Sequence, residues 1–460
     1  MKKIALLLAC ILMTLVCITI AEETPTVYTC GDYEYILLDD GTVEITAYNG
    51  TNKKVDIPEE LDGYVVTSIG EDAFYHCSSL TSISIPDSVT SIGDRAFSFC
   101  DSLTSITIPD SVTSVGVNPF WYCENLTEIK VSPDNPTLAT IDGVLFDKTE
   151  KKLICYPCAF TAKSYLIPQG IISIGKDAVF NCNALTEITI PDSVTSIGGG
   201  AFSWCGNLSE IIIPDSVTYV GSNPFSYCKK LTEIKVSPDH PTLATIDGVL
   251  FDKTEKKLIC YPDSFTEKSY SIPQGIASIG DNAFYTCYSL TEITIPDSVT
   301  SICNEAFMWC SNLTEIIIPD SVTSIGNSAF CGCESLTSIS IPDSVTSIGD
   351  YTFFGCQSLT SITIPDSVTS IGDRAFYECR SLTSIIIPDN VTSIGDYAFE
   401  SCESLTSITI PDSVTSIGVD AFYGCDPLTL TVERNSYAAQ YAKENDIDYT
   451  YPDALDWLNG

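Results

Sequence analysis

The sequence predicts a repeat solenoid, mostly β with short helical turns, of about fifteen coils of 23 residues, two of them lengthened to 36. Residues 85–107 read IPDSVTSIGDRAFSFCDSLTSIT, and the next Ile-Pro pair begins the same phrase again. The pair returns, mostly at steps of 23 residues, at Ile190, Ile213, Ile295, Ile318, Ile341, Ile364, Ile387 and Ile410. One such coil cannot bury its apolar residues alone, so we expect the stacked coils to share one continuous core.

Residues 1–21 have the features of a secretory signal peptide. Lys2 and Lys3 provide a positive start, residues 4–20 an apolar run, and Ala21 ends a small-x-small cleavage site. A single membrane anchor is the alternative, but no polar, positive stop signal follows Ala21. We therefore expect a mature chain that begins at Glu22 and has no membrane span.

Residues 22–56 precede the first coil and predict a β-hairpin cap. Residues 33–38 (YEYILL) and 42–46 (TVEIT) have strand composition, and the DDG between them is a turn signal. Such a hairpin would cover the first end of the core and its open sheet edge.

Residues 57–430 form the predicted solenoid, and each coil contains two short strands. In LTSITI, Leu103, Ile106 and Ile108 have the L-x-x-L-x-L spacing that points one set of side chains inward. Residues 112–116 (VTSVG) alternate as a second strand. A short helical turn is expected to bury one further group of residues, which in the preceding coil is Ala96, Phe97 and Cys100.

Two coils carry nearly identical inserts, at about 132–166 and 237–271. Both contain TLATIDGVLFDKTEKKLICYP or its close copy, with an Asp-Gly hairpin turn, so the chain has a larger duplication of 105 residues. The inserts hold much of the scarce lysine, at Lys148, Lys151, Lys152, Lys253, Lys256 and Lys257. Residues 431–460 are a predicted C-terminal cap that includes an amphipathic helix at 435–445.

These segments resemble the BspA-like, or Treponema pallidum type, leucine-rich repeats of bacterial surface proteins. The repeated pattern LTSITIPDSVTSIGDRAFSFC carries the resemblance over residues 57–430, and YEYILLDDGTVEI, DGVLFDKTEKKLICYP and SYAAQYAKEN are similar to accessory parts of that family. The resemblance implies a secreted or surface-displayed binding protein, in some members an adhesin for host matrix proteins or other bacteria. It transfers no ligand, because the family has no fixed binding residues.

The charge balance limits the classes of partner. The chain has 60 acidic and 22 basic residues, a net charge of −38. Nucleic acid would be repelled, whereas a basic patch on a protein or divalent cations would be attracted.

Two columns of repeated residues invite a chemical interpretation. Thirteen cysteines recur once per coil, and we expect mostly reduced, buried thiols, although neighbours in the column approach disulfide distance. We interpret Cys155-Tyr156-Pro157-Cys158 as a chance C-x-x-C, because its duplicate has Asp263 in place of the second cysteine. The second column is Asp87, Asp110, Asp192, Asp215, Asp297, Asp320, Asp343, Asp366, Asp389 and Asp412. Solvated turn caps are expected there, with calcium binding as the alternative.

The sequence favours a binding protein over an enzyme. His76 and His240 are the chain's two histidines, and the sequence has no phosphate-binding glycine loop and no nucleophile elbow. No cofactor or metal site is predicted. Stacked threonines such as Thr104 and Thr107 admit ice binding as another hypothesis, but Ser, Glu, Lys and Ile break the array.

The candidate binding site is the outward face of the L-x-x-L-x-L strands, together with the lysine-bearing inserts. Isoleucine replaces Thr or Ser outward at Ile212, Ile317 and Ile386, where a partner gains most on burial. Charged neighbours on this face are Glu210, Glu315, Lys130 and Lys235. We expect a protein partner, such as a host matrix or bacterial surface protein. The alternative is a structural surface coat or calcium-stabilised solenoid with no dedicated partner.

Overall fold

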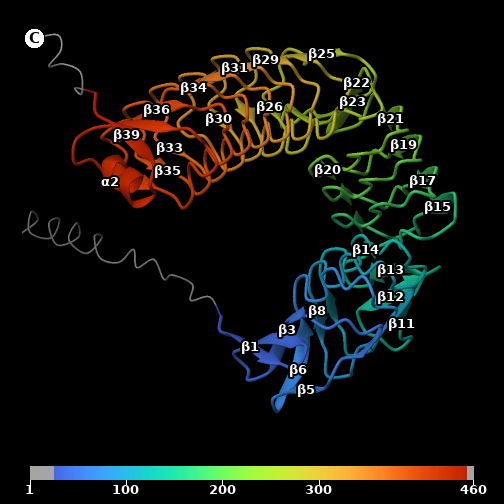
Figure 1. Cartoon of the computed structure of the whole chain (residues 1–460). Helices are drawn as coiled ribbons and strands as arrows, with labels where there is room; N and C mark the ends of the chain where they lie inside the picture. Colours follow the sequence, from blue (N-terminus) through green and yellow to red (C-terminus); the bar gives the residue numbers. More distant parts are fainter. Residues whose placement is uncertain (1–24, 453–460) are drawn as a thin grey trace, which may run out of the picture.

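The computed structural model describes residues 25–452, which form a curved β-solenoid (Figure 1). The expected signal peptide and the last eight residues lie outside the described range. The chain makes about 18 turns, somewhat more than the sequence suggests, because strands of the inserts and of both ends also stack as coils. The rod-like shape expected from the repeat is bent into an open arc (Figure 1).

The L-x-x-L-x-L segments form one set of strands, named here the leading strands, which lie along the outer side of the arc (Figure 1). Equivalent residues of neighbouring leading strands pair in parallel, as in Ser338↔Ser361 and Ile339↔Ile362. The leading strands are β4 (Lys54–Asp56), β7 (Ser82–Ser84), β9 (Ser105–Ile108), β11 (Glu128–Val131), β15 (Ser164–Leu166), β17 (Glu187–Thr189), β19 (Glu210–Ile213), β21 (Glu233–Val236), β25 (Ser269–Ser271), β27 (Glu292–Thr294), β29 (Glu315–Ile317), β31 (Ser338–Ser340), β32 (Ser361–Thr363), β34 (Ser384–Ile385), β36 (Ser407–Ile410), β38 (Thr429–Val432) and β39 (Asp448–Thr450).

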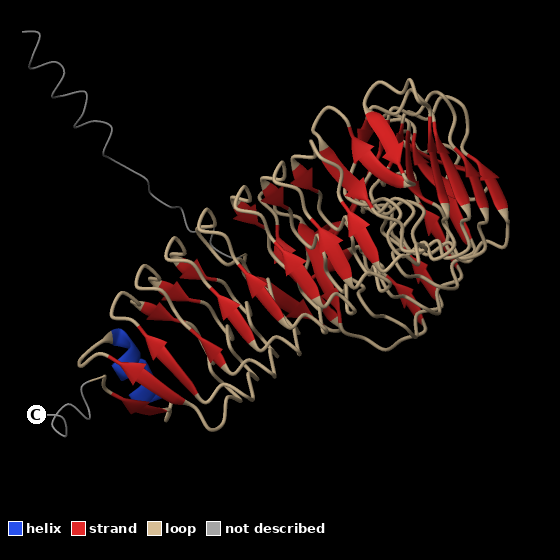
Figure 2. Ribbon diagram, turned by 90° about the horizontal axis from the view of Figure 1, so that it is seen from above, coloured by secondary structure: helices blue, strands red, loops and turns tan. Residues whose placement is uncertain are grey.

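The V-T-S-I-G segments form the second strands, which lie on the inner side of the arc, and Figure 2 shows the strands stacked from coil to coil. In most of them the side chains alternate between the core and solvent, as the period-two pattern predicts, whereas the strands at 152–155 and 257–260 end in three consecutive buried residues. The second strands are β6 (Tyr64–Ile69), β8 (Ser91–Ile92), β10 (Ser114–Val115), β14 (Lys152–Cys155), β16 (Ser173–Ile174), β18 (Ser196–Ile197), β20 (Tyr219–Val220), β24 (Lys257–Cys260), β26 (Ser278–Ile279), β28 (Ser301–Ile302), β30 (Ser324–Ile325), β33 (Ser370–Ile371), β35 (Ser393–Ile394) and β37 (Ser416–Ile417).

The polar letters of the repeat also hold neighbouring coils together. The Ser413 hydroxyl donates to the Val391 carbonyl of the preceding coil at 2.7 Å, and the Thr415 hydroxyl donates to Thr392 at 3.3 Å. The glycine that ends the second strand lets the coils approach closely, since a Cβ on Gly372 would lie 2.6 Å from the Asp350 nitrogen. The serine, threonine and glycine positions that recur along the chain therefore stabilise the stacking of neighbouring coils.

The segment expected to be a short helical turn is a series of tight turns. In the coil that contains Cys77, backbone hydrogen bonds join Tyr75 N–H to Asp72 O at 2.8 Å and Cys77 N–H to Phe74 O at 3.2 Å. Asp72 and His76 have positive φ angles of 50° and 61°, which interrupts a helix. Alternate N–H groups instead bond to the next coil, as in Phe74 N–H to Ala96 O at 2.7 Å.

A column of stacked phenylalanine rings fills the core beneath these turns. Its longest run has ring centroids 5.0–5.6 Å apart and interplanar angles of 1–13°, within the range for stacked aromatic pairs. The rings of this run are Phe284, Phe307, Phe330, Phe353, Phe376, Phe399 and Phe422.

All thirteen column cysteines are buried, as predicted. The Cys356 thiol is typical, since it donates to the Phe330 carbonyl of the preceding coil at 3.2 Å. Burial raises the pKa of the Cys356 thiol well above its ordinary value, so the reactive thiolate is suppressed. At this position the thiol packs the core and links two coils.

The described part of the chain begins with an antiparallel meander in which β1 (Val27–Cys30) pairs with β2 (Tyr33–Leu37) and β2 pairs with β3 (Val43–Tyr48). Strand β3 then pairs in parallel with β6, which with the short strand β5 (Glu60–Leu61) belongs to the first coil. Strands β2 and β3 lie where the sequence predicts a hairpin.

Each insert repeats this arrangement. In the first, β12 (Leu138–Ile141), β13 (Val144–Asp147) and β14 are antiparallel, and β14 continues in parallel with β16. In the second, β22 (Leu243–Ile246), β23 (Val249–Asp252) and β24 do the same before β26. The inner sheet therefore restarts at each insert.

The buried residues form three clusters, spanning 35–155, 144–260 and 249–442, in place of the expected single core. The boundaries coincide with the inserts, because each three-stranded meander ends one ladder of coils and begins the next.

The second insert is anchored by a buried histidine. The Nδ1 atom of His240 accepts hydrogen bonds from Thr242 N–H at 3.2 Å and Leu243 N–H at 3.0 Å, so its proton lies on Nε2, which is 3.2 Å from Pro214 O. In the first insert Asn135 makes the equivalent bonds through its side-chain amide. The histidine is therefore structural.

Replacing His240 with Ala is expected to lower the free energy of unfolding by roughly 1–3 kcal/mol, because three backbone groups around the buried ring lose their partner. His240→Asn should cost much less, since asparagine does the same work in the first insert. Urea unfolding of the two variants tests this. Equal losses would mean that the ring fills space only.

The C-terminal end is closed by α2 (Tyr437–Glu444), the helix expected from the sequence. Ser436 caps its N-terminus, accepting from Ala439 N–H at 3.1 Å. The ring of Tyr441 packs edge-on against Phe422 at 6.2 Å and so covers the last ring of the phenylalanine column.

Candidate binding face

The outward surface of the leading strands is named here the leading face. Along these strands exposed and buried residues alternate, as in β29, where Glu315 and Ile317 are exposed on either side of buried Ile316. The leading face therefore consists of successive parallel sheets on the outer side of the arc (Figure 1).

The three candidate isoleucines are exposed on the leading face. The exposed fractions are 58% for Ile212, 72% for Ile317 and 78% for Ile386. Ile317 and Ile386 lie along the same stretch of coils, because β29 and β34 belong to one six-stranded sheet. Ile212 lies on β19, which belongs to a separate sheet. The structure therefore distributes them along the face and does not bring all three together.

Each isoleucine lines a shallow open depression. The depression at Ile212 has a volume of about 690 Å³, the one at Ile317 about 300 Å³ and the one at Ile386 about 680 Å³. Their floors are the leading strands, and the depressions at Ile212 and Ile386 also include the turns that follow these strands.

The charged candidates fall into different environments. Lys235 contacts Glu210 at 2.6 Å and Glu233 at 3.2 Å, and the Glu210 carboxylate raises the pKa of the Lys235 ammonium. Lys235 is also the register partner of Ile212. The candidate residues Ile212, Glu210 and Lys235 therefore lie together. Glu315 lies beside Ile317 on β29.

Lys130 stands apart from the isoleucines. It lies on β11, next to Thr107 of β9, and pairs with Glu128 at 2.9 Å.

Sequence reasoning missed Leu166, which is 64% exposed at the end of β15. It pairs with Thr189, the residue one coil before Ile212, and so occupies the same outward slot. Counting back 23 residues from Thr189 would have found it, but the insert before β15 hides the period. Its counterpart in the duplicate is Ser271, which pairs with Thr294.

The lysines of the inserts are engaged to different degrees. The Nζ atoms of Lys148 and Lys253 bond to the backbone carbonyls of Asn135 and His240, and so help fix the inserts. Lys152 pairs with Glu150 at 3.5 Å. These lysines therefore support the inserts as much as they charge the surface.

The threonines of the leading face have a structural task. The Thr383 hydroxyl donates to the Thr360 carbonyl at 3.2 Å, and Thr360 donates to Thr337 at 3.1 Å. These bonds fix the hydroxyls of this threonine column to the backbone of the preceding coil.

All ten aspartates of the predicted turn column are exposed. Within residues 25–452, no group of three or more His, Cys, Asp or Glu side chains is arranged to hold a metal ion. The same part of the chain has no helix with the length and hydropathy needed to cross a membrane.

A family model described as the BspA type leucine rich repeat region matches residues 44–162, 154–271, 259–345 and 323–442. No curated protein matches the chain.

Several solved structures are similar over most of their length. A leucine rich cell surface protein from Faecalibacterium prausnitzii has 31% identity, covers 93% of this chain and 99% of its own, and gives a TM-score of 0.43. A leucine-rich repeat protein from Eubacterium ventriosum has 23% identity, coverage of 87% and 95%, and a TM-score of 0.52, which supports the solenoid fold. The pneumococcal vaccine antigen PcpA has 19% identity, coverage of 93% and 99%, and a TM-score of 0.46.

Proposed function

This chain belongs to the BspA-type leucine-rich repeat family, and from that premise we propose that it is a secreted or cell-surface protein that binds other proteins through its leading face. The observation that carries the proposal is the exposure of Ile212, Ile317 and Ile386, each at a slot that most coils fill with Thr or Ser. Exposed aliphatic side chains on a solvated sheet lower solubility, and they gain free energy when a partner covers them.

Two further features support this role. The similar protein from Faecalibacterium prausnitzii is described as a cell surface protein. The leading face is broad, and scattered anchors on a broad sheet suit a macromolecular partner better than a small molecule. The proposed partner is of the kind that an adhesin binds, namely a host matrix protein or a protein on the surface of another bacterium. The leading face serves binding and not catalysis.

The triple variant Ile212→Thr, Ile317→Thr and Ile386→Thr is expected to capture its partner about tenfold more weakly than the natural chain, because anchor side chains dominate interface energies. Immobilised protein would be exposed to purified matrix proteins and to bacterial surface extracts, and bound protein would be quantified over a concentration series. The variant should keep its melting temperature, since all three side chains are exposed.

Ile172→Thr is a matched control, because Ile172 is 40% exposed but precedes the second strand β16 and not a leading strand. Its capture should equal that of the natural chain. Undiminished capture by the triple variant would exclude the leading face. Absence of any saturable partner would favour a structural coat.

A further inference from the structure

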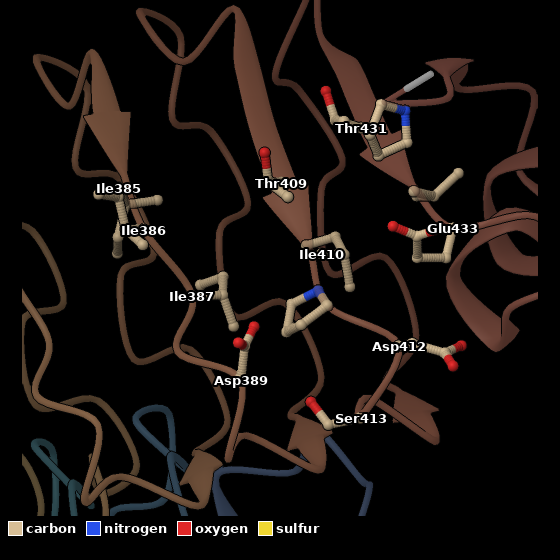
Figure 3. Close-up of a pocket in the computed structure, with 13 residues that line it drawn as sticks. Ile385, Ile386, Ile387, Asp389, Thr409, Ile410, Asp412, Ser413, Thr431 and Glu433 are labelled. Carbon is tan, nitrogen blue, oxygen red and sulfur yellow. The ribbon is translucent and has the colours of Figure 1, made fainter. Parts of the chain in front are cut away.

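The depression around Ile386 differs from the other two in the chemistry of its rim. A row of register partners crosses its floor, from Ile386 through Thr409 to Thr431 (Figure 3). Asp389, Asp412 and Glu433 also line it, and each carboxylate belongs to a different coil.

No lysine or arginine lines this depression. The depression at Ile212, by contrast, contains Lys235, which is already held by Glu210 and Glu233. The depression at Ile317 has Glu315 as its one charged lining residue. The surface at Ile386 therefore combines the most exposed of the three isoleucines with three carboxylates and no cation.

We propose that the depression at Ile386 binds an extended polypeptide segment of a partner protein in which an apolar side chain stands between lysines or arginines. The apolar side chain would lie on Ile386, and the cations would reach the carboxylates of Asp389, Asp412 and Glu433. This inference rests on the proposed protein-binding function and adds the chemistry of the partner.

The spacing supports an extended segment. Neighbouring coils lie roughly 5 Å apart, so three carboxylates on three coils span roughly 10 Å. Side chains at positions i and i+2 of an extended chain point the same way, about 7 Å apart. The residue between them points away, so an apolar side chain at i+2 and cations at i and i+4 are the ones that share the face toward the depression. The two cations then reach the carboxylates of different coils, and flexible lysine side chains accommodate the remaining difference.

The test uses the full chain and three synthetic peptides in which every second position is serine. The positions between carry lysine and leucine in turn, lysine and serine in turn, or glutamate and leucine in turn, so that both residue types of a pair share one face of the extended chain. Affinity is measured by fluorescence anisotropy at physiological and at high salt. We expect saturable binding of the lysine–leucine peptide with at least tenfold preference over both others, because either the apolar or the cationic contact is missing from each of those.

Two variants locate the binding. Ile386→Thr should weaken the lysine–leucine peptide about tenfold at both salt concentrations. The charge variant Asp389→Asn, Asp412→Asn and Glu433→Gln should weaken it by a similar factor at physiological salt and flatten its salt dependence. The matched control Ile172→Thr, off the leading face, should bind this peptide as the natural chain does, and melting curves check that every variant is folded.

Equal binding of the lysine–serine peptide would show attraction by net charge alone and overturn the proposal. An Ile386→Thr variant with unchanged affinity would overturn it as well, as would concentration-dependent self-association that this substitution abolishes, since a second copy would then be the occupant. These results leave the proposed function standing if natural partners are still captured through Ile212 or Ile317.

Discussion

The Asp263→Asn variant is expected to be more stable than the natural chain at pH 8, by at most about 4 kcal/mol, and equally stable near pH 4. Asp263 follows β24 in the second insert, at the site that Cys158 occupies in the first. Its Oδ1 atom is buried without a hydrogen-bond partner in the structure, although the residue as a whole is partly exposed. The Oδ2 atom accepts a hydrogen bond from Thr286 at 3.1 Å.

The cause is the cost of burying a charge. Burial raises the pKa of Asp263 to about 7, against the opposing effects of hydrogen bonds from Thr286 and Tyr227 and of the nearby Lys229. The other titratable groups that face it are Cys228, Cys260, Cys287, Tyr285 and Tyr288. A carboxyl group in the unfolded chain titrates near pH 4.

The sign follows from the tighter hold on the proton in the folded state. An acid with a raised folded pKa contributes its full stability below pH ~4 and loses it as the pH rises toward 7. Asparagine carries no charge at any pH, so the variant escapes this loss.

Urea unfolding of both proteins between pH 4 and 8 measures the difference. Asp297→Asn, at an exposed turn, is the control and should show no such pH dependence. A stability difference that stays constant with pH would contradict the argument.

Phe353→Ala is expected to lower the free energy of unfolding by about 3–5 kcal/mol, because it leaves a cavity in the phenylalanine column. The Phe353 ring is fully buried and stacks on Phe330 at 5.6 Å and on Phe376 at 5.4 Å. The coils on either side are fixed by their own ladders, so the gap cannot close fully.

The neighbouring residue provides the control. Phe354 is half-buried and stacks on Tyr377 at 4.8 Å at the surface, so Phe354→Ala should cost about 1 kcal/mol. Thermal and urea unfolding of the two alanine variants compares them directly. Similar losses would show that the buried column contributes no more than surface stacking.

The coil was predictable because each residue position of the repeat has one structural role. Leu103, Ile106 and Ile108 are buried as their spacing predicts. The helical turn was less accessible to prediction, since its apolar spacing fits a helix, while left-handed residues such as His76 become visible only in the backbone.

The sequence could predict which single residues of the candidate site are exposed. It could not predict which of them lie next to one another. Exposure of Ile212, Ile317 and Ile386 follows from strand alternation. The acidic rim at Ile386 forms where the turn after one strand lies beside the turns of later coils. Glu433, which directly follows β38, belongs to this rim but lies outside the regular repeat. Such a combination depends on the shape of the chain end, which periodicity does not describe.

The three separate clusters of buried residues bear on how such a chain grows. Each cluster starts with its own antiparallel meander. A duplicated unit of 105 residues therefore contains the meander that starts its sheet. Insertion or removal of one unit adds or removes one complete inner sheet together with its meander. The length of the molecule, and with it the distance between its two ends, can therefore change during evolution without any redesign of the coil.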